Sequence, residues 1–476
     1  MKVTFVVPPW TFLDIRAHDT QGIAGAWPPI GSLYIAAVLR EAGHQVNFYE
    51  GRFHSHAEMV DLIAADQPDV VGAFVIAMFW ERTQRLFRDI RARCPHTFLV
   101  VGGHGPSARD IECLNELPEL GAVVRSEAEY TMRELVNRLE TGQPLDGLLG
   151  ATVRVDGLPV RNPPRPFIEP LDELPFPAMD LARRYPYRPS YGQVLRLPTF
   201  QVISSRGCVN HCIYCYRLMG SKVLRLRTPE NVVDEIEHYV LRYGARDIKF
   251  WDECFTFDRQ RVVGMCEEIL RRNIRVSWWV SARADYVDLQ MLKLMKRAGC
   301  WCINIGVESG VQKNLDTLRK NLTLSQIEHA VRWTHQAGIK TFLTFIFGIP
   351  GETFEEGLET IRFAKRLDGH LAEFFPISPF PGTVLHDMAS EVGVINPDVK
   401  QIGLLKEEIG FHPHTMTASQ VSELRRRAFR EYYFRPRRVV KYVSSIRSWF
   451  EVQGLINGFT TLLKFTRKRD DCGYNF

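Results

Sequence analysis

The first 142 residues alternate short apolar runs with amphipathic segments of helical period. The apolar runs, which are typical of buried strands, lie at 2–7, 45–50, 69–75, 97–103 and 122–127. Strands and helices in alternation, joined by short connections, predict a parallel sheet with helices on both faces. Ligands of such sheets bind beyond the carboxyl ends of the strands. We therefore expect residues 1–145 to form a doubly wound, flavodoxin-like or Rossmann-like domain.

The rest of the chain predicts two further domains. Residues 157–190 lose the periodicity and fill with proline, so we assign 146–195 to a connector. A second strand and helix series of six units runs from 200 to 383. It predicts a partial parallel barrel over 196–395, with chemistry at the carboxyl ends of its strands. Helical spacing without a strand pattern then predicts a helical region over 396–476.

Composition narrows the class of protein only slightly. Hydrophobic residues make up 45% and charged residues 24% of the chain, as in globular proteins. No apolar run approaches the roughly 18 to 20 residues of a membrane span. The first apolar run stops at Pro8 and Pro9, which favours a strand over a signal peptide. We therefore expect a cytoplasmic protein.

The formal net charge of +5 is mild but unevenly distributed. Residues 425–441 contain eight basic residues and one Glu. Three interpretations are open: a solvated or interdomain helix face, attraction to an anionic substrate, and peripheral contact with the inner face of the membrane through an amphipathic helix. Nucleic-acid binding is not expected, because the basic segment is local.

Three cysteines, Cys208, Cys212 and Cys215, lie within eight residues just after the first strand of the second series. A structural zinc site would need a fourth ligand, for which Cys254 or Cys302 are the candidates, and the chain has no second C-x2-C pair. Three thiolates instead suit a [4Fe-4S] cluster with one open iron, where a small molecule can bind and react.

The C-x3-C-x2-C spacing, with aromatic Tyr214 before the last cysteine, resembles the radical S-adenosylmethionine (SAM) enzymes. The resemblance implies that the three cysteines hold the cluster, that its open iron chelates SAM, and that a 5′-deoxyadenosyl radical takes hydrogen from substrate carbon. Other residues at strand ends resemble the family's SAM contacts. With Tyr214, these candidates are Asp252, Glu253, Ser281, Arg283, Glu308 and Gly348.

The N-terminal domain adds a second resemblance. The segments "PPIGSLYIAAVLREAGHQV" (28–46), "VVGGHGPS" (100–107) and "LDELPFPAMDL" (171–181) resemble cobalamin-binding radical SAM enzymes, in particular the anaerobic magnesium-protoporphyrin monomethyl ester cyclase branch. Asp-x-His-x-x-Gly, the motif that places a histidine under cobalt in many cobalamin proteins, is absent from the sequence. The candidate cobalamin contacts are Trp10, Trp27, Glu50, Phe74, Ile76, Gly102, Gly103, His104, Gly105, Glu127 and Glu129.

These resemblances imply an enzyme that functionalises an unactivated C–H bond. Its cofactors would be a [4Fe-4S] cluster, SAM and cobalamin, used as methylcobalamin in C-methylation. The alternative is oxidative cyclisation or hydroxylation without methyl transfer. A sensor that only binds cobalamin is a third hypothesis, although it has no use for an open iron. Expected partners are a small-molecule substrate, which could be an anionic compound, a tetrapyrrole, a lipid or a natural-product intermediate, and an external electron donor such as flavodoxin or ferredoxin.

Overall fold

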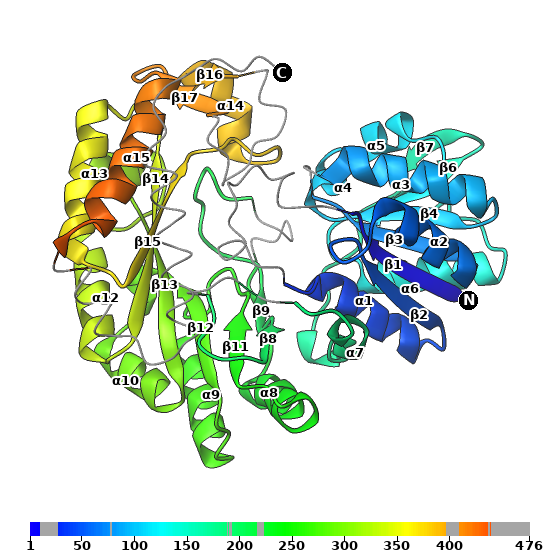
Figure 1. Ribbon diagram of the computed structural model, residues 1–476, viewed down its shortest axis with the longest axis horizontal. Helices are drawn as coiled ribbons and strands as arrows, with labels where there is room; N and C mark the ends of the chain where they lie inside the picture. Colours follow the sequence, from blue (N-terminus) through cyan, green and yellow to red (C-terminus); the bar gives the residue numbers. More distant parts are fainter. Residues whose placement is uncertain are drawn as a thin grey trace. The chain divides into compact units, whose positions relative to one another are not determined.

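The structure, a computed structural model, describes residues 1–9, 27–76, 79–187, 189, 193–216, 223–396, 409–436 and 438. The chain forms two compact units (Figure 1). The first is built mainly from residues 1–14 and 26–188, and the second mainly from residues 189–217 and 222–476. Trp10, one of the predicted cobalamin contacts, lies outside the described residues.

Within the described residues, the first unit contains one sheet of seven strands in the order β2-β1-β3-β4-β5-β6-β7. β1 to β5 run parallel, as the alternating pattern predicts, and the strand order of these five is that of flavodoxin. The strands are β1 (Lys2–Val7), β2 (Gln45–Glu50), β3 (Val70–Phe74), β4 (Phe98–Gly102), β5 (Ala122–Val124), β6 (Ala151–Val155) and β7 (Leu158–Arg161).

The last two strands lie in the stretch that we assigned to a connector. β6 pairs antiparallel with β5, and β7 pairs antiparallel with β6. Asp156 and Gly157, with φ of 48° and 82°, form the tight turn between them. Asp-Gly between alternating apolar residues favours such a hairpin, because both turn positions need positive φ. The prolines after residue 158 hid this signal.

Helices cover both faces of the first sheet, so both faces are apolar. The core on one face contains side chains from α2, α3 and α5, such as Ile63, Phe87 and Leu114, packed on Val71 and Val101. Helices α1 and α6 pack together on the other. The helices are α1 (Ile30–Glu41), α2 (His56–Asp66), α3 (Trp80–Arg93), α4 (His104–Ala108), α5 (Asp110–Glu116), α6 (Glu129–Glu140) and α7 (Met179–Arg183), and a 3-10 turn, η3, spans Leu171–Glu173.

The second unit has a parallel sheet of six strands among the described residues, in the order β15-β14-β13-β12-β11-β8. Sequential order without reversal confirms the predicted partial barrel. Its strands are β8 (Thr199–Val202), β11 (Asp247–Phe250), β12 (Ser277–Ala282), β13 (Cys300–Glu308), β14 (Lys340–Phe347) and β15 (Leu371–Pro376). A short antiparallel pair, β9 (Ser205–Arg206) and β10 (Arg225–Leu226), flanks the cysteine loop.

Helices lie along one side of this sheet (Figure 1). They are α8 (Pro229–Tyr243), α9 (Arg259–Arg271), α10 (Leu289–Arg297), α12 (Leu324–Gln336) and α13 (Phe354–Leu367), with α11 (Gln312–Thr317) and the 3-10 turn η4 (Ala284–Tyr286) in the loops. Capping boxes begin α12 at Thr323 and α13 at Thr353. Because each box satisfies backbone amides at a helix start, it fixes the loop that leads from the preceding strand.

The C-terminal region contains α14 (Val384–Val392), β16 (Gly393–Ile395), β17 (Phe411–Pro413) and α15 (Ala418–Tyr433). Arginines of the basic segment bind within the second unit. Arg425 Nε donates to the Phe374 carbonyl at 3.0 Å, and Arg435 and Arg438 each donate to Asp368 at 2.9 Å. These three arginines therefore serve internal contacts. Residues 439–476, which carry the predicted membrane-contacting helix, lie outside the described residues.

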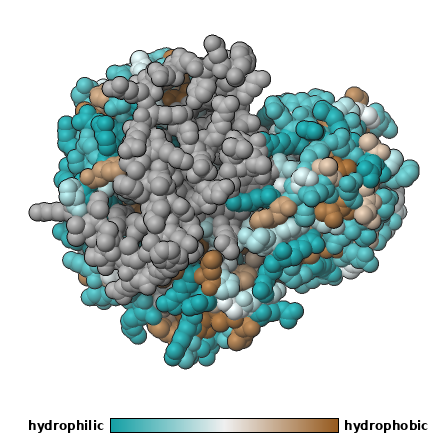
Figure 2. Space-filling view, in the orientation of Figure 1, coloured by the Kyte–Doolittle hydropathy of each residue, from teal (hydrophilic) through white to brown (hydrophobic). Residues whose placement is uncertain are grey.

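Apolar side chains are gathered in the cores. On the visible face in Figure 2 the described surface is mostly hydrophilic, with separate apolar spots. Among the helices of the described residues, none has the length and hydropathy needed to cross a bilayer.

Candidate active site

The cysteine loop is anchored at its middle residue. Ile213 is buried, its N–H donates to the Leu318 carbonyl at 3.1 Å, and its carbonyl accepts from the Leu385 N–H at 3.0 Å. Cys212 and Cys215 flank this anchor, and together with Cys208 they are at least partly accessible, whereas the other described cysteines are buried. The fold therefore holds the loop firmly while it presents three thiols.

This donor set fits an iron-sulfur cluster. Thiolates are the usual ligands of such clusters, and three leave one iron free for another ligand. In the described part of the chain, no three His, Cys, Asp or Glu side chains converge on one metal ion. A cubane needs no such convergence, because each thiolate binds a different iron. Cys254 and Cys302, the candidates for a fourth zinc ligand, are both buried.

Asp252 holds the segment that leads into this loop. One carboxylate oxygen accepts from the N–H groups of Ser204 and Ser205, at 2.7 and 3.1 Å, and the other accepts from the Ser204 hydroxyl. Arg261 donates to the same hydroxyl at 2.9 Å. We predicted Asp252 as a SAM contact, but both of its carboxylate oxygens already accept hydrogen bonds from protein donors. Its neighbour Glu253 is exposed at the same strand end.

A buried charged group lies beside the loop. Tyr214 donates its hydroxyl to Glu308 at 2.9 Å, and the Lys320 ammonium lies 2.6 Å from the same carboxylate oxygen. Glu308 and Lys320 are each 6% exposed. A Cβ on Gly306 would lie 2.4 Å from this oxygen, so glycine makes room for the pair. Two predicted SAM contacts, Tyr214 and Glu308, are thus brought together.

Sequence reasoning missed Lys320. It follows α11, twelve positions after Glu308, in a charged stretch that is typical of a solvated loop. Nothing in the local pattern distinguishes it from the neighbouring Arg319. Burial of its partner Glu308 gives the ammonium its role, because a buried carboxylate needs a matching charge.

Two other predicted SAM contacts, Ser281 on β12 and Arg283 just after it, differ in how many protein partners their side chains have. Arg283 is 7% exposed and donates from Nε to Asp285 at 3.0 Å and from one terminal nitrogen to the Lys320 carbonyl at 2.7 Å. It therefore holds the Lys320 loop. Ser281 is half-buried, and its carbonyl accepts from Phe255 N–H at 3.2 Å.

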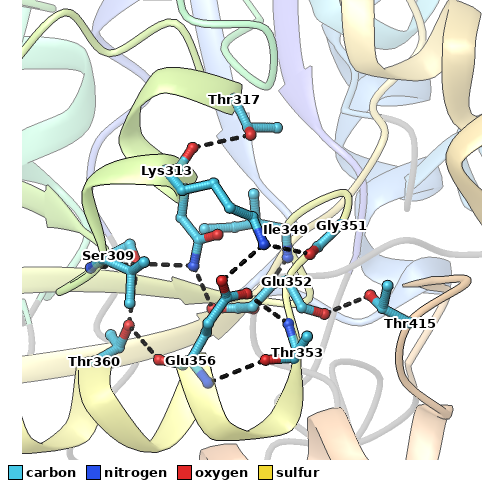
Figure 3. Close-up of polar contacts among 12 residues, drawn as sticks. Ser309, Lys313, Thr317, Ile349, Gly351, Glu352, Thr353, Glu356, Thr360 and Thr415 are labelled. Atoms are coloured by element: carbon cyan, nitrogen blue, oxygen red, sulfur yellow. Dashed lines mark hydrogen bonds and ion pairs between the residues drawn. The ribbon is translucent and has the colours of Figure 1, made fainter.

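Gly348 begins a rigid loop after β14. Its φ is 83°, a conformation that favours glycine, and its N–H donates to Glu352 at 2.7 Å. Ile349 N–H donates to the same oxygen at 3.2 Å, and Asn314 donates to the other at 3.1 Å. Figure 3 shows this network, with Ser309 on one side of Glu352 and Thr415 on the other. Burial raises the pKa of Glu352 to about 8, against the lowering effect of the Gly348 and Ile349 N–H groups.

In the first unit, predicted cobalamin contacts gather at the ends of the adjacent strands β3 and β4. The rings of Phe74 and His104 meet edge to face at 5.8 Å between centroids. Gly103, at φ 103°, brings its backbone so close that a Cβ would lie 2.6 Å from the Val75 carbonyl. Burial lowers the pKa of His104 and so favours the neutral imidazole. Ile76, Gly102 and Gly105 belong to the same two strand ends.

The remaining predicted cobalamin contacts are more dispersed. Glu50, at the end of β2, accepts from the Arg52 N–H at 3.2 Å and from the Tyr187 hydroxyl. Glu127 and Glu129 are both buried. Glu127 accepts from the Ile168 N–H at 2.7 Å, so its carboxylate binds the backbone at Ile168. Trp27 lies half-buried before α1. The order of the strands in the sheet reverses between β1 and β3, and proteins of this topology bind ligands at such a switch point.

Comparison with known proteins covers both units. Residues 202–364 match the radical SAM superfamily and residues 20–136 match the B12 binding domain. An uncharacterized methyltransferase of Pyrococcus horikoshii is 31% identical over 473 residues, 96% of each chain. The anaerobic magnesium-protoporphyrin IX monomethyl ester cyclase of Rubrivivax gelatinosus is 29% identical, over 83% of this chain and 70% of that one.

A solved structure shares the fold. It is the radical SAM methyltransferase TsrM from Kitasatospora setae, with cobalamin and a [4Fe-4S] cluster bound. The TM-score is 0.69 at 21% identity, and the alignment covers 89% of this chain and 84% of TsrM.

Proposed function

The chain belongs to the cobalamin-binding enzymes of the radical SAM superfamily, and from this premise we propose that it methylates an unactivated carbon of a small-molecule substrate. When bound, the [4Fe-4S] cluster and SAM supply a 5′-deoxyadenosyl radical, and cobalamin supplies the methyl group. One observation carries the proposal: the anchored loop that presents Cys208, Cys212 and Cys215 at the carboxyl ends of an open parallel barrel.

The chain's own residues provide binding and orientation. The three cysteines would hold the cluster, and Asp252 fixes the approach to their loop through Ser204 and Ser205. Glu308, which pairs with the Lys320 ammonium, can accept hydrogen bonds from an ammonium or from ribose hydroxyls. In the first unit, the glycine-rich end of β4 would let the backbone approach the corrin closely.

Methylation is favoured over cyclisation by the relatives. The Pyrococcus horikoshii protein, which matches nearly end to end, is named as a methyltransferase, and so is TsrM. The cyclase of Rubrivivax gelatinosus supports oxidative cyclisation as the second candidate, at slightly lower identity over less of the chain. An external one-electron donor, such as flavodoxin or ferredoxin, is part of either proposal.

The test uses full-length protein reconstituted without oxygen, with cobalamin, a reductant and SAM labelled in its methyl group with deuterium. It is incubated with small-molecule extract of the host, and products are followed by mass spectrometry. We expect 5′-deoxyadenosine, S-adenosylhomocysteine and a labelled product. Deoxyadenosine without label in any product, together with a product that gained oxygen or lost hydrogen, would replace methylation by the cyclase-type reaction.

The variant C212A tests the cluster assignment, with C94A as its matched control. Cys94 is also a free cysteine but is buried in the first unit. We expect C212A to lose bound iron and all deoxyadenosine formation, and C94A to retain both. Unchanged iron content in C212A would show that this thiol is not a cluster ligand.

A further inference from the structure

Side chains on the strands of the second sheet alternate between two chemically different faces. Positions facing the helices are apolar and fully buried; they include Ile248, Val280, Ile305, Leu343 and Phe374. The strand register places their neighbours together on the inner face: Lys249, Ser281, Asn304, Thr344 and Glu373. A barrel interior filled only for packing would be dominated by branched apolar residues. The inner face instead carries these polar side chains among apolar ones, since Trp279 pairs with Cys302 and Asn304 pairs with Phe342.

Lys249 lies within this face between two indole rings. Its Nζ is 3.9 Å from the ring centroid of Trp251 and 4.0 Å from that of Trp279. The side chain is only 7% exposed, and burial lowers its pKa to about 7. The charges nearest to the amine include the Glu373 carboxylate, which opposes this shift. Two aromatic faces favour a cation at this position.

Two polar atoms near Lys249 on the inner face are buried and have no hydrogen-bond partner among the described residues. They are Trp279 Nε1, on a side chain 4% exposed, and Asn304 Oδ1. Buried polar groups are usually satisfied, so an unsatisfied donor beside a buried amine indicates that something else binds there. An indole N–H and an ammonium are both donors, and together they match an acceptor that carries negative charge.

These residues form a column that leads to the candidate active site. Trp279 pairs with Lys249 on one side and is followed on the inner face by Ser281, which pairs with Asn304. Gly306 is the next inner-face position of β13, and above it lie Glu308 and Lys320. A molecule held at Lys249 and Trp279 can therefore extend toward the cysteine loop along polar positions.

We propose that Lys249 and Trp279 form a subsite that binds an oxyanion group of the substrate, a carboxylate or a phosphate. The inference rests on the proposed function, because it assigns the substrate class of that same barrel. Trp251 and Trp279 would contact the flat apolar part next to the oxyanion, and Asn304 would accept a hydrogen bond from a substrate N–H or O–H.

The test measures binding of probes to the reconstituted full-length protein by calorimetry. Benzoate and phenyl phosphate are the two oxyanion probes, and benzamide is the neutral control of the same shape. We expect at least one oxyanion to bind, and the stronger of the two identifies the group. Benzamide binding as tightly as benzoate, or no binding of either oxyanion, would overturn the subsite.

Variants test whether the oxyanion probes bind at Lys249 and Trp279. K249M should weaken oxyanion binding at least about tenfold, since a hydrogen bond to a charged group is lost. W279F, which keeps the ring and removes the N–H, should weaken it by about fivefold. K293M removes an exposed lysine of α10 and should not change it. Equal affinity in K249M and K293M would refute the proposal, and W279F decides if K249M does not fold. Label transfer from SAM is measured separately, so loss of the subsite and loss of the proposed reaction are distinguishable.

Discussion

The two sheets of this protein are both parallel where they carry their candidate sites, yet they are covered differently. In the first unit, consecutive residues of β3 such as Val70 and Val71 are both fully buried, because helices pack on both faces. In the second unit, Ile305 is fully buried toward the helices, whereas its neighbour Asn304 is polar and partly exposed on the inner face.

This difference decides where each sheet can bind a ligand. A sheet covered on both faces offers only the ends of its strands, and the predicted cobalamin contacts Phe74, Gly103 and His104 lie at such ends. An open barrel offers its strand ends and its inner face. The second unit can therefore hold a cofactor at one level and a substrate group at another.

Removing the buried Lys320 ammonium, which pairs with the Glu308 carboxylate, should have the largest effect. K320M leaves the Glu308 carboxylate buried without its charge partner, which costs about 3 to 5 kcal/mol of unfolding free energy. K313M is the matched control, because Lys313 pairs with Glu356 on the surface, with side chains 54% and 23% exposed, and such pairs contribute less than about 1 kcal/mol. Urea unfolding measures both. Similar losses would mean that the Glu308 pair is not buried in solution.

Substitutions on opposite faces of one strand test the comparison directly. I305A should cost about 2 to 5 kcal/mol, and N304A should change stability by less than about 0.5 kcal/mol. In the first unit, V70A and V71A should both be costly, at about 1 to 3 kcal/mol each. Thermal unfolding of the four variants is the measurement. If V70A and V71A differed as strongly as the β13 pair does, one face of the first sheet would be open as well.

Substituting Gly103, directly after β4, tests whether this strand end of the first unit binds cobalamin. G103A forces a Cβ to within 2.6 Å of the Val75 carbonyl at φ 103°, and we expect a loss of about 2 to 3 kcal/mol and weaker retention of cobalamin. G43A has a similarly positive φ, 87°, but open space around its Cβ, and should cost about 1 kcal/mol. Unfolding and cobalamin absorbance after gel filtration report the two effects. Full cobalamin retention in G103A would remove this strand end from the site.

The smallest effect concerns pH. The folded pKa of Glu352, about 8, lies above the ordinary glutamate value of 4.5, so the folded state binds the proton more tightly. Its stabilising contribution is complete below about pH 4.5 and is lost as pH rises through 8. E352Q should remove this dependence, because glutamine does not titrate. Asn314 Oδ1, which has no partner among the described residues, can accept from the new amide once the Asn314 amide has turned over.

Thermal unfolding from pH 5 to pH 9 checks this prediction. Wild type should lose on the order of 1 to 3 kcal/mol relative to E352Q across that range. E355Q, an exposed change in the first turn of α13, three residues after Glu352, is the control and should follow wild type. Parallel curves for wild type and E352Q would contradict a protonated Glu352.

Much of the fold could be predicted because the signals are local. Apolar runs and helical spacing within a few residues predicted both parallel sheets, and the spacing of Cys208, Cys212 and Cys215 predicted the cluster loop. The hairpin of β6 and β7 was missed although Asp156 and Gly157 marked its turn, because proline-rich composition outweighed the dipeptide.

The sequence by itself determined the order of elements and the thiol set, since periodicity and motif spacing act over one turn or one loop. Only the tertiary structure decided what the charged residues do. Asp252 and Ser204 lie 48 positions apart, and Tyr214 and Glu308 lie 94 apart, yet they bind one another. Whether a carboxylate faces a ligand, as Glu308 can, or holds the backbone, as Asp252 does, depends on burial and on partners brought from distant strands. Those properties arise only when the strands have come together in the folded sheet.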